Sequence, residues 1–458
     1  MHSPYPEQEA GARWLAGRVS GLLADAPGFG KSGQALLAAQ RVGAQRVLVL
    51  CPAVAWLNWE REAGKWGNQL PVVRVTRPDD HRRPHPEAPQ LVIASYDGVA
   101  TSKQLRAALN RGTWDALVLD EVHRCKEKDA RRTKAVYGLR TDGRNCLAGK
   151  ALHTWLLSGS PMPNHAGELW THFSAFWPDL IRERYSGRVL DQEGFIRRYC
   201  QVRTNEYGGF KVLGYHDREG LTSLLNRVML RRDKIEGLPE LVVREEPVLV
   251  EVEDDRLAEL EQHEEFEALE AVLNSAAARE QDLEGIEDEF IHLATLRRLT
   301  GVLKAKGSAE AIAEELGQGD KVVVFAIHRE VIEALAHHLK GYRPAVIHGG
   351  TPDGKRNEEI DRFQQDPTCQ VFIGQVEACK EAITLTAGNR IWVVEAPWSP
   401  ETLGQVLARC HRRGQQKTVF ARFTAIAGSI DETVAAVLSL KARNIQAIMS
   451  AKYGENDQ

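Results

Sequence analysis

Two short segments of this chain carry side chains that could act on a phosphate ester. The first is a glycine loop between an apolar run at 22–25 and a helical pattern at 33–41, and it reads Ala26-Pro27-Gly28-Phe29-Gly30-Lys31-Ser32. Backbone N–H groups of such a loop, together with the helix N-terminus, suit a triphosphate. We expect Lys31 to reach the β- and γ-phosphates and Ser32 to ligate Mg²⁺. The first glycine of the general pattern is missing, so a plain glycine turn is the alternative.

The second segment is a pair of carboxylates, Asp120 and Glu121, at the end of the apolar run 116–120. Asp120 is expected to hold Mg²⁺ through water, and Glu121 to orient and activate the attacking water. The alternative is a pair that only stabilises a helix N-terminus. Because the pair ends a strand downstream of a phosphate loop, the sequence favours hydrolysis.

A third segment supplies positive charge near the C-terminus. Arg409 and Arg412 are three residues apart, which predicts that they share one helix face. Planar guanidinium groups suit the negative charge that spreads over a transferring phosphoryl group. We therefore expect both to reach a γ-phosphate presented by the other half of the chain, with a surface basic patch as the alternative.

These residues need a framework that brings them together. Both halves of the chain alternate short apolar runs with helical patterns, which is typical of parallel α/β sheets. The predicted strands are 22–25, 46–51, 91–95, 116–120 and 155–159 in the first half, and 321–326, 344–349, 371–374 and 390–396 in the second. Several runs are apolar throughout, as expected when helices cover both faces of a sheet.

Length and charge limit the interpretation. The chain has 458 residues and a net charge of −4, and its length suffices for two or three domains. Residues 251–289 hold 16 acidic and two basic residues, so the remainder carries a net charge of +10. This distribution permits binding to a nucleic-acid backbone without demonstrating it. The acidic run is typical of a solvated helix face, and an interaction surface is the alternative.

Several kinds of protein are not indicated. No apolar stretch is long enough to span a membrane, and residues 1–8 lack an apolar signal core. We expect no membrane association and a cytoplasmic protein, or a nuclear one if the source is eukaryotic. The seven cysteines form no C-x-x-C pair, which predicts buried, reduced thiols and no zinc site.

The order of the motifs resembles that of Swi/Snf-type ATPases of helicase superfamily 2, over residues 5 to about 445. That family has an aspartate where the general phosphate loop has its first glycine, and Asp25 matches it. The other matching segments are C-P at 51–52, N-W-x-x-E at 58–62, S-Y at 95–96, D-E-x-H at 120–123, S-G-S-P at 158–161, L-R-R-x-K at 230–234, F-x-x-H at 325–328, and W…Q…R-x-H-R-x-G-Q from 398 to 415. Residues 195–200 look most like the annealing-helicase branch.

The resemblance implies an α/β fold of two RecA-like lobes with parallel sheets and helical protrusions between them. Lobe one is expected at 1–235, with a helical insertion at about 178–230. Lobe two is expected at 236–458, with an acidic helical insertion at about 251–300.

The resemblance also implies ATP and Mg²⁺ as cofactors, with ATP bound between the lobes. The implied ATP-binding residues are Gln8, Asp25, Ala26, Pro27, Gly28, Phe29, Gly30, Lys31 and Ser32, with Ser32 and Asp120 serving Mg²⁺. The implied catalytic residues are Lys31, Asp120, Glu121, Arg409 and Arg412. The implied DNA contacts are Ser95, Asn164, Lys380, Thr384 and Trp398. For Trp398, a buried packing role is the alternative to stacking on a base.

The function implied is that of a monomeric, ATP-driven translocase on double-stranded DNA, forked or branched DNA included, that remodels DNA or protein–DNA complexes or anneals strands. One alternative is a strand-separating DNA or RNA helicase of the same superfamily. The other is a nucleotide-gated DNA-binding module with weak hydrolysis, because both glycines of the family's A-A-G-x-G-L-x-L-T motif are replaced at 378–386. Two further departures are Glu7, where an aromatic residue usually precedes the glutamine that reads adenine, and Ala408, where an aspartate is usual.

Overall fold

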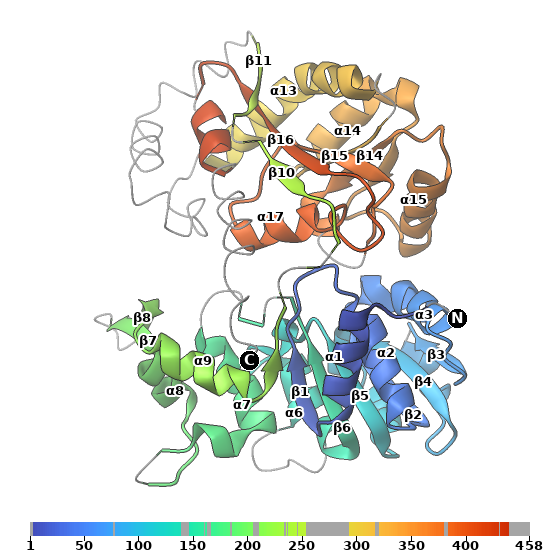
Figure 1. Ribbon diagram of the computed structural model, residues 1–458, viewed down its shortest axis with the longest axis vertical. Coiled ribbons are helices and arrows are strands. Elements are labelled where there is room, and N and C mark those ends of the chain that lie inside the picture. The colour runs from blue at the N-terminus through green and yellow to red at the C-terminus, as the bar shows by residue number, and fades with distance from the viewer. Residues whose placement is uncertain are drawn as a thin grey trace. The chain divides into compact units, whose positions relative to one another are not determined.

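The computed structural model divides the chain into two compact units, Met1–Arg232 (unit 1) and Asp233–Gln458 (unit 2). The residues that it describes are 3–76, 78–138, 146–159, 161–162, 166–183, 186–204, 210–232, 235, 237–244, 246–252, 293–316, 320–379, 383–429 and 431–438. Each unit contains a parallel sheet covered by helices, so the predicted pair of RecA-like α/β lobes is confirmed (Figure 1).

The sheet of unit 1 has seven strands in the order β3-β4-β2-β5-β6-β1-β9. All of its pairings are parallel. Its strands are β1 (Ser20–Leu23), β2 (Arg46–Cys51), β3 (Val72–Val75), β4 (Gln90–Ser95), β5 (Trp114–Asp120), β6 (Ala151–Leu157) and β9 (Met229–Leu230). The five predicted strands are present. The sequence did not indicate β3, which is only partly buried, or β9, which has two residues.

Helices cover both faces of this sheet, because side chains of a buried parallel strand point alternately to the two sides. Alternate strand residues pack with α4 (Tyr96–Thr101), α5 (Lys103–Leu109) and α6 (Arg131–Tyr137) in one apolar core. The strands also contact α1 (Pro6–Ala16), α2 (Lys31–Arg41) and α3 (Trp56–Lys65).

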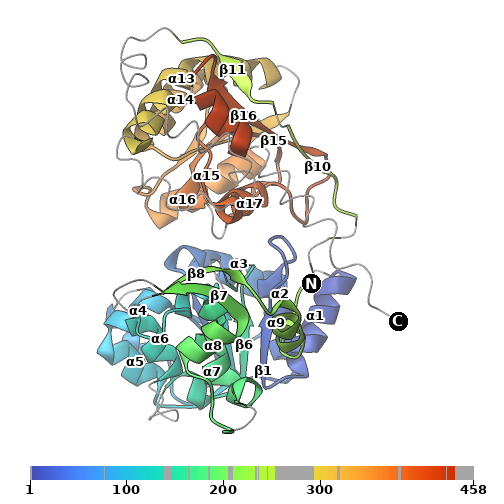
Figure 2. The same cartoon turned by 90° about the vertical axis from the view of Figure 1, so that its left-hand side faces the viewer.

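The second half of unit 1 adds a small subdomain beside the sheet (Figures 1 and 2). It consists of α7 (Trp170–Phe176), α8 (Gln192–Tyr199), α9 (Arg218–Asn226) and a hairpin of β7 (Cys200–Thr204) and β8 (Phe210–Tyr215). The hairpin is antiparallel, and the helices enclose a separate apolar core that includes Phe173 and Phe195. The insertion predicted at 178–230 was expected to be helical, and the hairpin is a correction to that prediction. Its two short strands lack the continuous apolar run that marked the central strands.

The sheet of unit 2 has the order β10-β16-β15-β12-β14-β13, with β11 also paired to β16. Every pairing is parallel. Its strands are β10 (Leu241–Val243), β11 (Val248–Val250), β12 (Lys321–Ala326), β13 (Ala345–Ile347), β14 (Val371–Gln375), β15 (Gly388–Val393) and β16 (Val419–Ile426). The four predicted strands are present. The long strand β16 was missed because Arg422 and Thr424 interrupt its apolar residues.

Two sets of helices pack on this second sheet. Helices α13 (Leu293–Leu316) and α14 (Arg329–His338) share one core with it, and α15 (Asp353–Gln365), α16 (Val376–Cys379) and α17 (Pro400–Leu407) share another. The acidic insertion predicted at about 251–300 lies largely outside the described residues, which resume at Leu293. None of the helices in the described ranges is both long and apolar enough to cross a bilayer. All seven cysteines are free and buried, as predicted.

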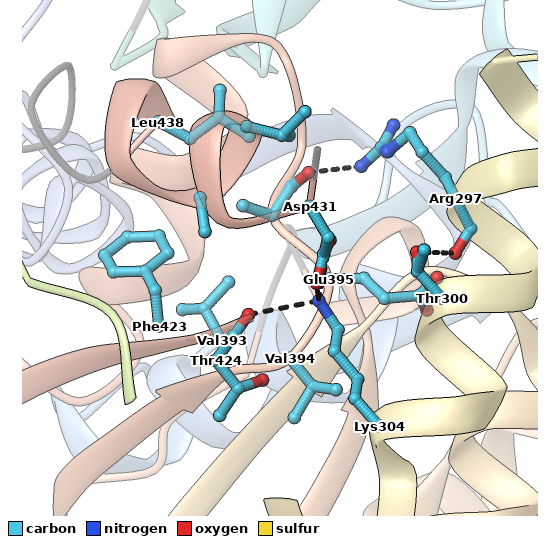
Figure 3. Close-up of a pocket in the computed structure, with 13 residues that line it drawn as sticks. Arg297, Thr300, Lys304, Val393, Val394, Glu395, Phe423, Thr424, Asp431 and Leu438 are labelled. Atoms are coloured by element: carbon cyan, nitrogen blue, oxygen red, sulfur yellow. Dashed lines mark hydrogen bonds and ion pairs between the residues drawn. The ribbon is translucent and has the colours of Figure 1, made fainter. Parts of the chain in front are cut away.

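An ion pair lies inside unit 2, where α13 meets the helical segment 431–438 (Figure 3). Lys304 Nζ lies 2.8 Å from Asp431 Oδ2 and donates to Thr424 O at 3.0 Å. The Lys304 side chain is 3% exposed, and Asp431 also accepts the amide of Ile426 at 3.1 Å. This pair ties the helical segment to the sheet.

Replacing Lys304 with methionine is expected to lower the free energy of unfolding of unit 2 by about 3 to 5 kcal/mol, because Asp431 would lose its partner in a buried position. Denaturant unfolding followed by circular dichroism measures this loss. Lys306→Met on the same helix is the matched control. Its pair with Glu310 is exposed and spans 3.9 Å, so we expect a change below about 0.5 kcal/mol. Equal stability of the two variants would contradict the prediction.

Candidate active site

The phosphate loop and the carboxylate pair of unit 1 meet at the carboxyl edge of its sheet. Leu23 at the end of β1 and Asp120 at the end of β5 both pair with Leu157 of β6, which lies between them. Two strand spacings place the ends of β1 and β5 about 10 Å apart. Ligands of open α/β sheets bind at this edge, because the loops that follow the strands converge there.

The glycine loop connects β1 to α2 and is shaped for close approach to a ligand. Gly28 and Gly30 have φ values of 99° and 73°, which side-chain-bearing residues rarely adopt. A Cβ at Gly30 would also lie 2.5 Å from Gln8 Nε2. Lys31 is the first residue of α2, and its ammonium donates to Asp25 O at 2.6 Å and to Ala26 O at 3.4 Å. The lysine side chain therefore folds back onto its own loop. Phosphate oxygens bound there would be stronger hydrogen-bond acceptors than these two carbonyls.

The predicted adenine-reading glutamine also contacts this loop. Gln8 lies on α1 and is 4% exposed. Its Nε2 donates to Phe29 O at 3.3 Å, and its Oε1 accepts the amide of Tyr5 at 3.1 Å. The structure thus brings Gln8 and the phosphate loop together.

Asp120 of the carboxylate pair is held by side chains from helices α3 and α4. Asp120 Oδ2 accepts the indole N–H of Trp59 at 2.8 Å, and Trp59 is fully buried on α3. Tyr96 donates its hydroxyl to Asp120 O at 2.8 Å. Burial raises the pKa of Tyr96 well above its usual value, so the hydroxyl stays protonated. The indole orients the Asp120 carboxylate, and the tyrosine hydroxyl holds the Asp120 backbone. Neither donor was identified as a site residue from the sequence.

Glu121 has an unusual backbone conformation. Its φ of 49° and ψ of 55° lie in the left-handed region, which costs a non-glycine residue about 1 to 3 kcal/mol. The turn directs the chain out of β5 and leaves the carboxylate partly exposed, 3.4 Å from His123 Nδ1. The same His123 nitrogen lies 3.1 Å from Ser158 Oγ. Ser158 belongs to the segment after β6, so this histidine links the carboxylate motif to the S-G-S-P motif.

The two predicted arginines of unit 2 do not share a helix face. Helix α17 ends at Leu407, and Arg409 and Arg412 lie in the turns that follow it. This corrects the expectation from their spacing. They nevertheless converge, because Arg409 Nη1 and Arg412 Nη1 both donate to Ile383 O, at 3.5 Å and 3.0 Å.

The same turns are fastened to the rest of unit 2. Gln415 Nε2 donates to Gly388 O at 2.9 Å and lies 3.3 Å from Thr386 O. His411 Nε2 donates to Pro239 O at 2.7 Å. Burial lowers the pKa of His411, so the ring is held neutral. The R-x-H-R-x-G-Q motif is therefore a compact turn whose polar side chains bind backbone carbonyls.

The residues predicted to contact DNA differ in their exposure and in whether the structure describes them. Ser95 is buried and caps α4, accepting the amide of Gly98 at 3.0 Å. Trp398 is 7% exposed in the core of unit 2, with the Arg297 guanidinium 4.8 Å from its ring centroid. This favours the alternative of a packing residue. Thr384 is partly buried beside the acceptor of the two arginines. Asn164 and Lys380 lie outside the described residues.

The residues at this edge fit a magnesium nucleotide. A serine hydroxyl and carboxylate oxygens are hard ligands of the kind that Mg²⁺ accepts, and Ser32 and Asp120 supply them. Within the described ranges, no group of three or more His, Cys, Asp or Glu side chains is placed to hold a metal alone.

Comparison with known families identifies the fold. A model of the SNF2-related domain matches residues 7–249, which is more than half of the chain. The chain belongs to the SNF2-related family. A model of the helicase conserved C-terminal domain matches residues 307–414, within unit 2.

Curated relatives of this SNF2-related chain match nearly all of it. It is 28% identical over 450 residues to a SWI/SNF-related matrix-associated actin-dependent regulator of chromatin subfamily A-like protein 1 homolog from Caenorhabditis elegans, covering 94% of this chain and 59% of the relative. It is 26% identical over 437 residues to the DNA annealing helicase and endonuclease ZRANB3 of Mus musculus, covering 92% of this chain and 38% of the relative. The chain thus spans less than two thirds of these relatives.

Among solved structures, the SNF2-related chain is similar to the Sulfolobus solfataricus SWI2/SNF2 ATPase core in complex with double-stranded DNA. The two share 20% identity at a TM-score of 0.44, over 98% of this chain and 94% of that one.

Sequence reasoning did not identify several residues that shape the site of this SNF2-related protein. Gln34 follows the loop motif by two residues and Trp59 lies in the N-W-x-x-E motif, yet nothing in their spacing indicates a contact with Asp25 or Asp120. The contacts join residues 9 and 61 positions apart. The sequence marks Arg232 only as part of the L-R-R-x-K motif, although it contacts Asp25 across 207 positions.

Proposed function

We propose that this chain is an ATP-dependent translocase on double-stranded DNA that remodels DNA or protein–DNA complexes. The observation that carries the proposal is the meeting of the Lys31 loop and the Asp120-Glu121 pair at one sheet edge in a chain of the SNF2-related family. The printed names of relatives include a DNA annealing helicase and an ATP-dependent DNA helicase, which supports DNA as the track.

The proposed reaction is hydrolysis of the γ-phosphate of ATP. Loop 25–32 would cradle the phosphates with its amides, and Lys31 would move its ammonium from the carbonyls of Asp25 and Ala26 to the β- and γ-phosphates. Ser32 and Asp120 would hold Mg²⁺, which neutralises phosphate charge when bound. Glu121 would orient the attacking water and accept its proton. Gln8, beside the loop, would bind the adenine edge.

The arginines of unit 2 have a proposed role in the same reaction. Arg409 and Arg412 would neutralise charge on the γ-phosphate as it is transferred. Their shared acceptor, Ile383 O, holds both guanidinium groups in one place. Thr384 follows that acceptor and is proposed as a DNA-backbone contact, together with Lys380 and Asn164. Phosphate contacts carry little sequence information, so sequence preference should be slight.

The proposal is tested by ATP hydrolysis rates with single-stranded, duplex and forked DNA and with RNA, measured beside triplex displacement and fork unwinding. We expect duplex DNA to raise the hydrolysis rate roughly tenfold or more, within the range of coupling between two sites. The third strand of a triplex should be displaced without separation of the duplex. Unwinding without displacement would favour a strand-separating helicase, and nucleotide binding without turnover would favour a gated DNA-binding module.

A further inference from the structure

The last residues of unit 1 run alongside β1 and reach the phosphate loop. Leu22 N donates to Val228 O at 2.9 Å, and Ala24 N donates to Leu230 O at 2.7 Å. The pattern continues past the end of β1, where Ala26 N donates to Arg232 O at 2.9 Å. Arg232 ends unit 1, and the next residue begins unit 2. The chain therefore leaves unit 1 at the phosphate loop itself.

The Arg232 side chain binds the loop as well. Its Nε donates to Asp25 Oδ1 at 2.9 Å, and its Nη2 contacts Asp25 Oδ2 in a bidentate ion pair. Its Nη1 donates to Glu7 O at 2.6 Å, next to Gln8. Asp25 is fully buried, whereas the Arg232 side chain is 22% exposed. A planar guanidinium can satisfy these separate acceptors at once, which a lysine ammonium cannot do with the same geometry.

A third side chain closes the network. Gln34 on α2 accepts from Arg232 Nη2 at 2.9 Å and donates to Asp25 Oδ2 at 3.1 Å. The same amide donates to Phe29 O at 3.2 Å, and the Arg232 guanidinium lies 5.4 Å from the Phe29 ring centroid. Gln34 is fully buried. Loop, helix α2 and the end of unit 1 thus share one set of hydrogen bonds.

Phosphate binding should disturb this network through Lys31. The Lys31 ammonium donates to Asp25 O at 2.6 Å. Asp25 therefore binds Lys31 through its backbone carbonyl and Arg232 through its carboxylate. Transfer of the ammonium to a phosphate would remove that donor from Asp25. The loop, and with it Arg232, would then have to find a new arrangement.

We propose that Arg232 is a positioning residue that couples the conformation of loop 25–32 to the segment leading into unit 2. This inference rests on the proposed function, because it requires that a nucleotide binds in loop 25–32. Arg232 would then pass the resulting change in the loop to the segment that follows it. The pair joins Asp25 of the loop motif to the L-R-R-x-K motif, so it gives the aspartate that replaces the first glycine of a general phosphate loop a physical purpose. A brace that merely keeps the loop folded is the competing role.

The test compares Arg232→Gln and Arg232→Lys with the wild type in the full chain. The ratio of ATP hydrolysis with duplex DNA to hydrolysis without it should fall about tenfold in Arg232→Gln, with Arg232→Lys between the two. Arg227→Gln is the matched control, because it removes an exposed arginine from the same segment, and its ratio should equal that of the wild type. A brace would lower the stability of the protein and raise the KM for ATP while leaving this ratio unchanged.

Hydrogen exchange with MgATPγS gives a readout that does not depend on DNA. In the wild type, the nucleotide should change exchange both in the peptide 22–36 and in the peptide 226–240. In Arg232→Gln, the first peptide should still respond and the second should not. A response of both peptides in the variant, as in the wild type, would overturn the coupling.

These measurements separate the two proposals. A wild type whose two peptides respond to MgATPγS, but whose hydrolysis duplex DNA does not stimulate, keeps the coupling and refutes the translocase. If duplex DNA stimulates hydrolysis but the ratio in Arg232→Gln equals that of the wild type, the translocase is kept and the coupling is refuted. If neither peptide responds in the wild type, both proposals are refuted.

A second variant serves if Arg232→Gln does not fold. The double variant Asp25→Asn/Arg232→Gln removes both charges but keeps amides that can bond to Gln34. In this variant the peptide 226–240 should likewise fail to respond to MgATPγS.

Discussion

Replacing Lys31 with alanine is expected to lower the rate of ATP hydrolysis about 10²- to 10³-fold, the loss typical of a preorganised charge-stabilising donor. The ammonium lies at the start of α2 and donates to Asp25 O at 2.6 Å. On ATP binding it needs only to exchange its carbonyl acceptors for phosphate oxygens. Without it, no side chain of the loop would balance the charge of the β- and γ-phosphates. Phosphate release from MgATP in the presence of duplex DNA measures the loss.

The Lys31 prediction has two controls. Lys103→Ala removes an exposed lysine at the start of α5 and should hydrolyse ATP at the wild-type rate. Lys31→Arg keeps the charge, yet it should also be impaired, because Pro27 and Lys31 Nζ already lie within 3.6 Å of the Cβ position at Gly159. A larger guanidinium has little room there. Hydrolysis by Lys31→Ala within threefold of the wild type would refute the assignment of this loop.

The second large effect is expected for Glu121→Gln, which should lower kcat about 10²- to 10⁴-fold while ATP binding is retained. Glutamine preserves the size of the side chain and its place in the left-handed turn, so the main change is loss of the basic carboxylate. Trp59 and Tyr96 continue to hold Asp120, which leaves the proposed Mg²⁺ ligand in place. Titration with a fluorescent ATP analogue should give a dissociation constant close to that of the wild type.

The matched control for this variant is Glu127→Gln, six residues further on and exposed. It should hydrolyse ATP as the wild type does. Single-turnover measurements separate the chemical step from product release in all three proteins. If Glu121→Gln turned over ATP normally, the water would have to be activated elsewhere, and the D-E-x-H motif would serve only to bind metal.

The central strands could be predicted because their apolar character follows from their position in the fold. A strand buried on both faces has no solvent-facing residue, so β2 and β12 were predicted with their observed bounds. Strand β16 escaped because Arg422 interrupts its apolar run. That arginine is accommodated by Glu315 of α13, whose carboxylate lies 3.0 Å from its Nη2. The Glu315 carboxylate compensates the charge of this arginine, and it is more than 100 positions away in the sequence.

The helix-face prediction for the arginine pair failed for a local reason. A spacing of three residues places two side chains on one face only if the helix continues through both, and α17 ends two residues before Arg409. The pair still converges, because both guanidinium groups bind Ile383 O. Their proximity therefore comes from a shared tertiary acceptor and not from helical periodicity.

The sequence by itself determined the chemistry available to this protein. It placed the glycine loop after one strand and the carboxylate pair after another, and parallel strands necessarily bring such ends to the same sheet edge. The tertiary structure alone decided which side chains hold these groups. Trp59 orients Asp120 and Arg232 grips Asp25 across 61 and 207 positions. Such contacts depend on strand order and on the path of the chain. Neither produces a periodic pattern of residues from which the contacts could be predicted.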